Sequence, residues 1–445
     1  MSSEPVIRRS RFGGVKTETS NTTVVKNSQI TNGSLEGEEI SSNSLVKQPR
    51  ARVKRPAGHL LNQIPKEILE NEELNEAVKL LPSNYNFEIH KTIYNLNKHK
   101  VKRAALQFPE GLLIYSLIIS DILQQFVNYE GLETVVMGDV SYGACCIDDF
   151  TARSLDCDII IHYAHSCLVP IDVTTLKVLY VFVTIQIDEV HLVKTLIKNF
   201  KKGTRLATVS TIQFNPALHS IKEKLAENDI HIITPQIRPL SKGEILGCTS
   251  KKLQPDLDPN DKVDYILYIG DGRFHLESMM IHNPNLMAYK YDPYNRQFTI
   301  EEYDQKQLVD IRTDAINKAK SAKTFGLILG ALGRQGNVKT LENLEALIKS
   351  NGHKVYKIIL SEIFPLKLAE FEQIDCFVQV ACPRLSIDWG YAFNKPLLTP
   401  YECNVLFGLE KSLTKNNDKE TYPMDYYESN GYGRGKLPEH NKKHI

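Results

Sequence analysis

Short apolar runs and amphipathic segments alternate along the chain, and the alternation recurs three times. Each repeat opens with an apolar run of strand length, which begins at Ala104, Leu206 or Phe325. A turn and a segment of helical period follow, most clearly in the third repeat, where one helix face carries Leu341, Leu344, Leu347 and Ile348. A second short strand follows each helix, in ETVVMGD, DIHIITPQ and KVYKIIL. The pattern predicts a repeated strand–helix–strand unit.

A later strand in each repeat begins with an aspartate, at Asp158, Asp264 and Asp375. These runs are nearly all apolar, as in parallel strands that helices cover on both faces. Strands that alternate with helices indicate small α/β layers. The predicted fold class is therefore α/β, with three homologous small α/β domains that contain parallel-type sheets. One long doubly wound sheet is the alternative.

The expected domain boundaries follow from the repeats and from changes in composition. The first 56 residues are polar, with ten Lys/Arg against five Asp/Glu, and include the basic run KQPRARVKR. Such a segment buries too little apolar surface to offset its ordering entropy, so a disordered basic tail is favoured over a nuclear address or an RNA-binding arm. The expected parts are this tail at 1–56, α/β domains at 57–200, 201–320 and 321–412, and a polar C-terminal tail at 413–445.

Composition restricts the class of protein. The 445 residues are 42% hydrophobic and 24% charged, and the net charge of +1 argues against a surface built for nucleic acid. No run approaches the ~20 apolar residues of a membrane span. The first residues lack the apolar core of a secretion signal. We therefore expect an intracellular, cytoplasmic protein that binds neither membrane nor nucleic acid directly.

The eight cysteines are expected to be thiols, because the cytosol is reducing. Burial is common for a free cysteine, and we expect it for Cys157, Cys167, Cys376 and Cys403. The others lie in loops beyond the carboxyl ends of strands, where α/β sheets collect their ligand sites. They are Cys145 and Cys146 in GDVSYGACCIDDF, Cys248 in PLSKGEILGCTS and Cys382 in VACPRLSIDWG.

Three loop cysteines, one from each repeat, could meet at a common centre. The separations of 103 residues from Cys145 to Cys248 and 134 from Cys248 to Cys382 match no local metal motif, since a zinc ribbon needs CxxC pairs. Three thiolates could instead hold an iron–sulphur cluster, which usually has four cysteine ligands, and would leave one iron open to a substrate. Cys146 is adjacent to Cys145, so we expect it to be structural.

Several other residues are expected to be structural. His162 and His165 lie on and just after an apolar strand, where a histidine is more often hydrogen-bonded than a metal ligand. Gly270 in GDGRF indicates a tight turn and does not open a dinucleotide-binding helix. Trp389, the only tryptophan, is expected to pack rather than to stack on a cofactor.

Five separated motifs resemble, in the right order, the 2-(3-amino-3-carboxypropyl)histidine synthase family of diphthamide biosynthesis, and within it the eukaryotic catalytic subunit. They are GDVSYGACCIDD, PLSKGEILGCTS, YIGDGRFHLES, GRQGN and CPRLSIDWG. The resemblance covers about residues 58–410 and excludes both tails. It implies three homologous domains in a pseudo-threefold triangle around a central 4Fe–4S cluster, with the ligands Cys145, Cys248 and Cys382.

The resemblance also implies a reaction and partners. A 3-amino-3-carboxypropyl group would pass from S-adenosylmethionine to a histidine of elongation factor 2 by a non-standard radical mechanism. This transfer would be the first step of diphthamide biosynthesis. The chain would form a heterodimer with the related second synthase subunit, and a small electron-donor protein would serve it.

Gln335, Arg384 and Asp388 match polar family positions beside the substrate. A guanidinium can bind the methionyl carboxylate through two hydrogen bonds. A carboxylate near a sulfonium or an ammonium offsets its charge. A surface ion pair between Arg384 and Asp388 is the structural alternative, and Glu402 in TPYEC has no assigned role.

Two other functions stay open from the sequence. A quinolinate-synthase-like protein would use the open iron as a Lewis acid on a small dicarboxylate, and the production of methylthioadenosine would distinguish the two enzymes. A scaffold subunit that binds elongation factor 2 without a cluster is the non-enzyme alternative. The brown colour of a bound cluster after anaerobic purification would exclude it.

Overall fold

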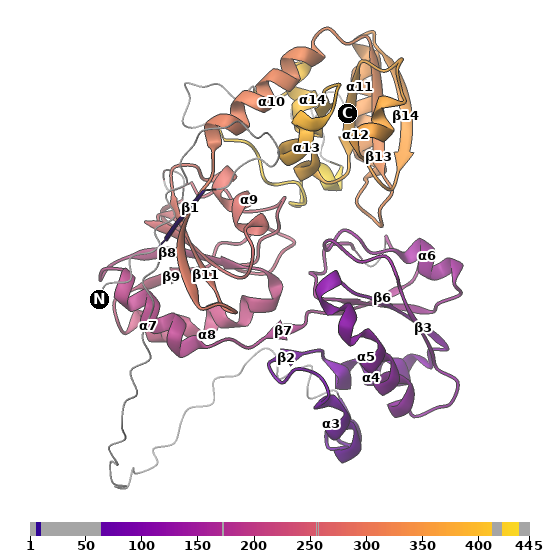
Figure 1. Cartoon of the computed structure of the whole chain (residues 1–445), viewed down its shortest axis with the longest axis vertical. Coiled ribbons are helices and arrows are strands. Elements are labelled where there is room, and N and C mark those ends of the chain that lie inside the picture. The colour runs from indigo at the N-terminus through magenta and orange to yellow at the C-terminus, as the bar shows by residue number, and fades with distance from the viewer. Residues whose placement is uncertain are drawn as a thin grey trace.

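The computed structural model describes residues 6–9, 64–170, 173–254, 256, 258–411 and 421–435. It contains three lobes, each built on its own β-sheet, that are arranged as a triangle (Figure 1). The expected architecture of three α/β domains is thus confirmed. Most of the expected N-terminal tail lies outside the described residues.

The first unit has a four-stranded sheet in the order β4-β3-β5-β6, and a two-stranded antiparallel pair, β2–β7, beside it. Its strands are β2 (Tyr85–Asn86), β3 (Arg103–Gln107), β4 (Glu133–Val136), β5 (Ile159–Tyr163), β6 (Lys177–Val181) and β7 (Thr184–Ile185). Its helices are α2 (Lys66–Leu69), α3 (Glu72–Val78), α4 (Ile89–His99), the 3₁₀ helix η1 (Glu110–Tyr115), α5 (Ser116–Phe126) and α6 (Asp149–Ser154).

The second unit has a six-stranded sheet in the order β1-β12-β11-β10-β8-β9. Its strands are β1 (Val6–Arg9), β8 (Arg205–Ser210), β9 (His231–Ile233), β10 (Tyr265–Ile269), β11 (Met287–Asp292) and β12 (Gln297–Glu302). Its helices are α7 (Glu189–Asn199), η2 (Ile212–Phe214), α8 (Asn215–Ala226), η3 (Pro259–Asp261) and α9 (Phe274–His282). Strand β1 pairs parallel with β12, so one part of the expected tail takes part in this sheet.

The third unit has a four-stranded sheet in the order β14-β13-β15-β16. Its strands are β13 (Thr324–Gly330), β14 (Lys354–Leu360), β15 (Cys376–Val380) and β16 (Leu397–Leu398). Its helices are α10 (Gln305–Ala319), α11 (Val338–Ser350), α12 (Pro365–Ala369), α13 (Pro383–Trp389), η4 (Gly390–Ala392) and α14 (Pro400–Leu406), followed later by η5 (Tyr432–Arg434). Among the residues that the structure describes, no helix is both long and apolar enough to cross a membrane.

The three sheets share one topology. In each, the first strand lies between the second and the third, the fourth lies beyond the third, and all four are parallel. A helix connects the first strand to the second in every unit: α5, α8 or α11. Parallel strands need such a crossover, which explains why the helical pattern always follows the first strand. The repeat seen in the sequence therefore corresponds to the same order of strands in all three sheets.

The recurring aspartate before the third strand has a local structural role. Its side chain accepts hydrogen bonds from backbone N–H groups at the start of the neighbouring first strand. Asp158 accepts from Lys102 and Arg103 at 2.7 and 3.0 Å, Asp264 from Arg205 at 2.7 Å, and Asp375 from Lys323 and Thr324 at 2.9 Å each. The carboxylates thus satisfy N–H groups at the edge where two parallel strands begin.

The unit boundaries differ from those expected at residues 200 and 320. Helix α7 packs Leu192 and Leu196 into the core of the second unit, and α10 packs Ile316 and Ala319 into the core of the third. Helix α4 does the same before β3 in the first unit. Each unit therefore begins with a helix and not with a strand. An amphipathic helix shows that it has an apolar face, but not which sheet covers that face.

Residues 421–435 correct the expectation of a polar C-terminal tail at 413–445. Five side chains of this segment are buried: Tyr422, Met424, Tyr426, Tyr427 and Tyr432. They belong to two apolar clusters that lie between units. We call residues 421–435 the C-terminal segment. The apolar surface of this segment comes mainly from tyrosine rings. Because tyrosine also has a polar hydroxyl, the sequence pattern understates how much ring surface the segment can bury.

Two expectations about single residues are also wrong. Cys157, Cys376 and Cys403 are buried as expected, but Cys167 is exposed. Trp389 ends helix α13 with 53% of its surface exposed, so it does not pack in the core. Neither the burial of a cysteine nor that of a tryptophan follows from residue type alone.

Candidate functional site

The three loop cysteines lie at the carboxyl ends of their sheets, one in each unit. Cys145 lies between β4 and α6, Cys248 lies between β9 and β10, and Cys382 caps the N-terminus of α13 directly after β15. Cys145 and Cys248 follow the second strand of their units, whereas Cys382 follows the third. The three positions are thus not equivalent in the repeat, although all lie at the edge where parallel α/β sheets place ligands.

The three thiols are half-buried and interact electrostatically. A hydrogen bond with Cys146 and burial raise the pKa of Cys145 well above its usual value, and negative charge on Cys248 and Cys382 raises it further. Burial, together with negative charge on Cys382, raises the pKa of Cys248 to about 12. Charges affect each other in this way only at short range. The structure therefore brings the three predicted cysteines within electrostatic range of one another, and Cys145 and Cys248 pack against the same apolar cluster.

Cys146 and Gln335 lie directly beside these cysteines. The Sγ atoms of Cys145 and Cys146 are 4.0 Å apart, and Gln335 Nε2 donates to Cys146 Sγ over 3.8 Å. Gly333, with φ at +54°, lies against the backbone of Cys146, so closely that a Cβ there would be 2.6 Å from the carbonyl carbon of Cys146. The GRQGN loop of the third unit thus covers the cysteine loop of the first.

No three His, Cys, Asp or Glu side chains among the described residues converge as the ligands of a single metal ion would. A cluster places different demands on its ligands, because each thiolate binds a different iron atom. Three thiols near one another, each from a different unit, suit a cluster better than a single ion.

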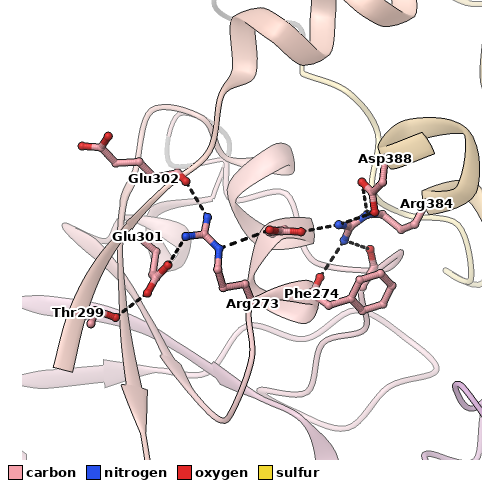
Figure 2. Close-up of polar contacts among 9 residues, drawn as sticks. Arg273, Phe274, Thr299, Glu301, Glu302, Arg384 and Asp388 are labelled. Atoms are coloured by element: carbon pink, nitrogen blue, oxygen red, sulfur yellow. Dashed lines mark hydrogen bonds and ion pairs between the residues drawn. The ribbon is translucent and has the colours of Figure 1, made fainter. Parts of the chain in front are cut away.

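Arg384 and Asp388 lie on α13 in a buried polar network, next to the second unit (Figure 2). Arg384 Nε donates to both carboxylate oxygens of Asp388 at 3.0 and 2.9 Å. Its Nη1 donates to the backbone oxygens of Gly247 and Phe274, and its Nη2 lies 2.5 Å from Glu277. Each nitrogen of this guanidinium already contacts an acceptor of the protein.

The network continues into the second unit with alternating charges. Arg273 lies 3.5 Å from Glu277 and 2.5 Å from the fully buried carboxylate of Glu301 (Figure 2). Since Gly247 precedes Cys248, and Arg384 follows Cys382 by two positions, the network holds two of the cysteine loops together. Binding of a substrate carboxylate by Arg384 stays a prediction. The ion pair of Arg384 is buried, and not at the surface as the structural alternative from the sequence supposed. Its contacts position the loop of Cys382 against the second unit.

A second ion pair holds the first unit to the third. Arg334 Nε and Nη2 donate to the two oxygens of buried Asp149 at 2.8 and 2.6 Å. The backbone N–H of Arg334 donates to the backbone oxygen of Cys145 at 2.9 Å. Burial opposes the charge on Asp149, but hydrogen bonds from Arg334 and Thr175 hold its pKa below the usual value. Sequence reasoning missed this pair, although both residues lie inside the motifs CCIDD and GRQGN.

The C-terminal segment contacts all three units around the thiols. Tyr426 N–H donates to the backbone oxygen of Cys248 at 3.2 Å, and Tyr427 N–H donates to Thr249 Oγ1 at 3.0 Å. Arg434 Nη2 donates to the backbone oxygen of Leu168 in the first unit at 2.9 Å. In the third unit, Thr340 and Asn337 donate to backbone oxygens of the segment. The segment therefore links the three units where the cysteines meet.

Glu402, which had no role from the sequence, pairs with Arg312 inside the third unit. Arg312 Nε and Nη2 donate to its two oxygens at 2.6 Å each, and both side chains are fully buried. Tyr422 of the C-terminal segment donates to Glu402 Oε1 at 2.8 Å. At Gly390 a Cβ would lie 2.2 Å from Arg312 Nη1, so a side chain there would displace the Arg312 guanidinium.

Breaking this pair is expected to destabilise the protein strongly. Glu402→Gln leaves the Arg312 charge buried without a counter-charge, which costs about 3–5 kcal/mol of unfolding free energy. The matched control is the exposed pair Asp314–Lys318, which lies on α10, the helix of Arg312. Asp314→Asn should cost no more than about 0.5 kcal/mol of unfolding free energy. Urea unfolding followed by circular dichroism measures both. Equal effects of the two substitutions would contradict a special role of the buried pair.

A cavity of about 380 Å³ lies between the first and second units, next to the cysteine centre. Tyr85, Leu112 and Ile185 line it from the first unit, and Phe214, Leu246 and Tyr294 from the second. Leu246 is two positions before Cys248. The walls are mainly apolar and aromatic with a few polar groups, as in small-molecule sites.

The polar groups of the cavity include two neutral histidines. Burial lowers the pKa of both His165 and His275 to about 4, so both rings are uncharged at neutral pH. His275 Nδ1 is buried and has no hydrogen-bond partner among the described residues. Ser166 donates to Glu244, also on the wall, and this bond joins the two units. The ring of His162 lies 5.2 Å from that of His165, and its Nδ1 is hydrogen-bonded to Gln107 at 2.8 Å, as expected for a structural histidine.

Residues 108–418 match the family model described as "Putative diphthamide synthesis protein". The chain is 65% identical over 405 residues to 2-(3-amino-3-carboxypropyl)histidine synthase subunit 1 of Kluyveromyces lactis, covering 90% of this chain and 92% of that protein. It is 62% identical over 435 residues to the protein of the same name from Saccharomyces cerevisiae, with 97% of each covered.

The fold is similar to that of a crystal structure of Dph2 from Pyrococcus horikoshii with a 4Fe-4S cluster. The TM-score is 0.62 at 25% sequence identity, and the match covers 76% of this chain and 97% of the other. The family model and the relatives extend across all three units and include the loops of all three cysteines. The chain therefore belongs to the diphthamide synthesis protein family.

Proposed function

We propose that this chain is the catalytic subunit that transfers a 3-amino-3-carboxypropyl group from S-adenosylmethionine to a histidine of elongation factor 2. The observation that supports this proposal most is the electrostatic proximity of Cys145, Cys248 and Cys382. Each comes from a different unit, and each lies in a motif that resembles the family. The relatives are named 2-(3-amino-3-carboxypropyl)histidine synthase, and this name contains the same aminocarboxypropyl group and histidine as the proposed reaction.

The donor set fits a 4Fe–4S cluster. Three thiols from three units lie within electrostatic range of one another, and the similar Dph2 structure contains such a cluster. Cys145, Cys248 and Cys382 would each hold one iron, and the fourth iron would stay open for substrate. When bound and reduced, the cluster would supply one electron to a carbon–sulphur bond of S-adenosylmethionine.

The residues around the thiols would control access and position. The cavity between the first two units has the size and the apolar lining to take the adenosyl part of S-adenosylmethionine. His275 lines this cavity, and its uncharged ring would not repel a cationic sulfonium. Arg334 and Arg384 would keep the cysteine loops in register through their ion pairs.

Partners follow from the same proposal. The relatives are each named as a subunit 1, which supports an assembly with a related second subunit. Elongation factor 2 would be the protein substrate, and a small electron-donor protein would reduce the site in the cytoplasm.

The products identify the bond that breaks. Three carbon–sulphur bonds meet at the sulfonium, and the geometry of the site selects one. Its thiols come from three units and not from one CxxxCxxC loop, so we expect cleavage towards the aminocarboxypropyl carbon. Dithionite and S-adenosylmethionine added to the cluster-loaded heterodimer should give methylthioadenosine and essentially no 5′-deoxyadenosine, as measured by liquid chromatography and mass spectrometry.

The same reaction without dithionite is the control and should yield neither product. If 5′-deoxyadenosine dominates, the proposed bond cleavage is wrong even though the family assignment stands. A protein that binds no iron under anaerobic conditions would instead favour the cluster-free scaffold.

A further inference from the structure

Tyr426 has a buried hydroxyl group that finds no partner in the part of the chain that the structure describes. The residue is 5% exposed, and its OH has no hydrogen-bond partner among the residues that the structure describes. The three other tyrosines of the C-terminal segment are hydrogen-bonded. Tyr422 OH bonds with Glu402, Tyr427 OH with the backbone of Gln335, and Tyr432 OH with Asn404. Tyr426 is therefore the exception in its own segment.

An unpartnered buried hydroxyl is destabilising, because it has lost its hydrogen bonds to water without replacement. Native proteins rarely keep such groups unless a bound group completes them. The ring of Tyr426 is well fixed, since it packs against Tyr427 with centroids 4.9 Å apart and an interplanar angle of 88°. The hydroxyl is thus held in one place and needs an acceptor that the described part of the chain does not supply.

The surroundings of Tyr426 indicate where that acceptor would lie. Its backbone N–H donates to Cys248, and its side chain belongs to the same packed cluster as Cys145 and Cys248. Burial raises the pKa of Tyr426 well above its usual value, and negative charge on Cys248, Cys382 and Cys145 raises it further. Tyr426 therefore lies within electrostatic range of all three thiols.

We propose that the Tyr426 hydroxyl donates a hydrogen bond to a sulphur atom of the cluster held by the three cysteines, and so raises the reduction potential of that cluster. A hydrogen bond to sulphur stabilises the more negative, reduced state, and such bonds are among the factors that set iron–sulphur potentials. The inference rests on the proposed function, because it needs a cluster at this site.

The test compares two variants of the cluster-loaded heterodimer that each lose one hydroxyl. Tyr426→Phe removes the proposed donor and keeps the ring. Tyr432→Phe is the matched control, because its hydroxyl lies in the same segment but contacts Asn404 and Glu410 instead of the thiols. Iron content and an electron paramagnetic resonance redox titration are measured for both. We expect full iron content in both, a lower midpoint potential for Tyr426→Phe only, and an unchanged potential for Tyr432→Phe.

An unchanged potential in Tyr426→Phe at full iron content would overturn the inference, as would an equal shift in Tyr432→Phe. Proton electron–nuclear double resonance on the wild-type reduced protein provides a second test that needs no variant. It should detect an exchangeable proton coupled to the cluster that disappears in D₂O, and its absence would also overturn the inference. A wild-type protein without iron would contradict the proposed function itself, which separates the two failures.

Discussion

Replacing any one of Cys145, Cys248 and Cys382 by serine is expected to remove most of the iron from anaerobically purified protein. Each thiol comes from a different unit, so no neighbouring cysteine of the same loop can substitute for Cys248 or Cys382. A serine hydroxyl is a poor ligand for iron in such clusters, which are held by thiolates. Iron and sulphide analysis of the heterodimer, together with its visible absorbance, measures the loss.

Cys146→Ser is the closest control. Cys146 is buried and adjacent to Cys145, but its thiol accepts from Gln335 and its backbone packs under Gly333. We expect this variant to retain most of its iron. Cys167→Ser, at an exposed thiol, should have no effect. A fully loaded cluster in Cys248→Ser would remove that residue from the ligand set.

Ending the chain at residue 420 is expected to disrupt both the cysteine centre and the fold. The deletion removes five buried side chains, four of them tyrosines. Burial of each such side chain contributes roughly 1.5–3 kcal/mol, or on the order of 10 kcal/mol together. That amount is comparable with the whole stability of a typical domain, about 5–15 kcal/mol. We expect little iron in the truncated protein and a large loss of resistance to urea and to limited proteolysis.

Two substitutions within the C-terminal segment refine this test. Met424→Ala empties a buried position and should cost about 2–5 kcal/mol. Asn430→Ala changes an exposed position of the same segment and should stay within about 0.5 kcal/mol. A truncated protein with full iron content and unchanged unfolding would show that the segment is not part of the core.

Some features of the molecule could be predicted from short stretches of sequence. The strands β3, β8 and β13 lie where apolar runs indicated them, and so do the later strands that follow Asp158, Asp264 and Asp375. Parallel strands buried on both faces must be apolar at nearly every position, which makes them visible without any knowledge of their neighbours. Helix α11 was equally clear, because its apolar face is continuous.

Other features depended on partners that no short stretch reveals. Helix α7 has a clear apolar face, but only the tertiary structure decides that the second sheet covers it. The sequence also carried no sign that the guanidinium of Arg384 contacts Glu277, more than a hundred residues away. The C-terminal segment looked like a tail because its tyrosines are partly polar, yet all four are buried in two apolar clusters between units.

The sequence by itself determined the repeated α/β elements, the three loop cysteines and the family to which the chain is similar. Secondary structure depends on residues up to about four positions apart, so periodicity in the sequence records it. Only the tertiary structure decided that Cys145, Cys248 and Cys382 meet, that Arg334 and Arg384 join their loops, and that the C-terminal segment covers them. These contacts arise from the packing of three separate units, and side chains so distant in sequence meet only when all three cores have formed.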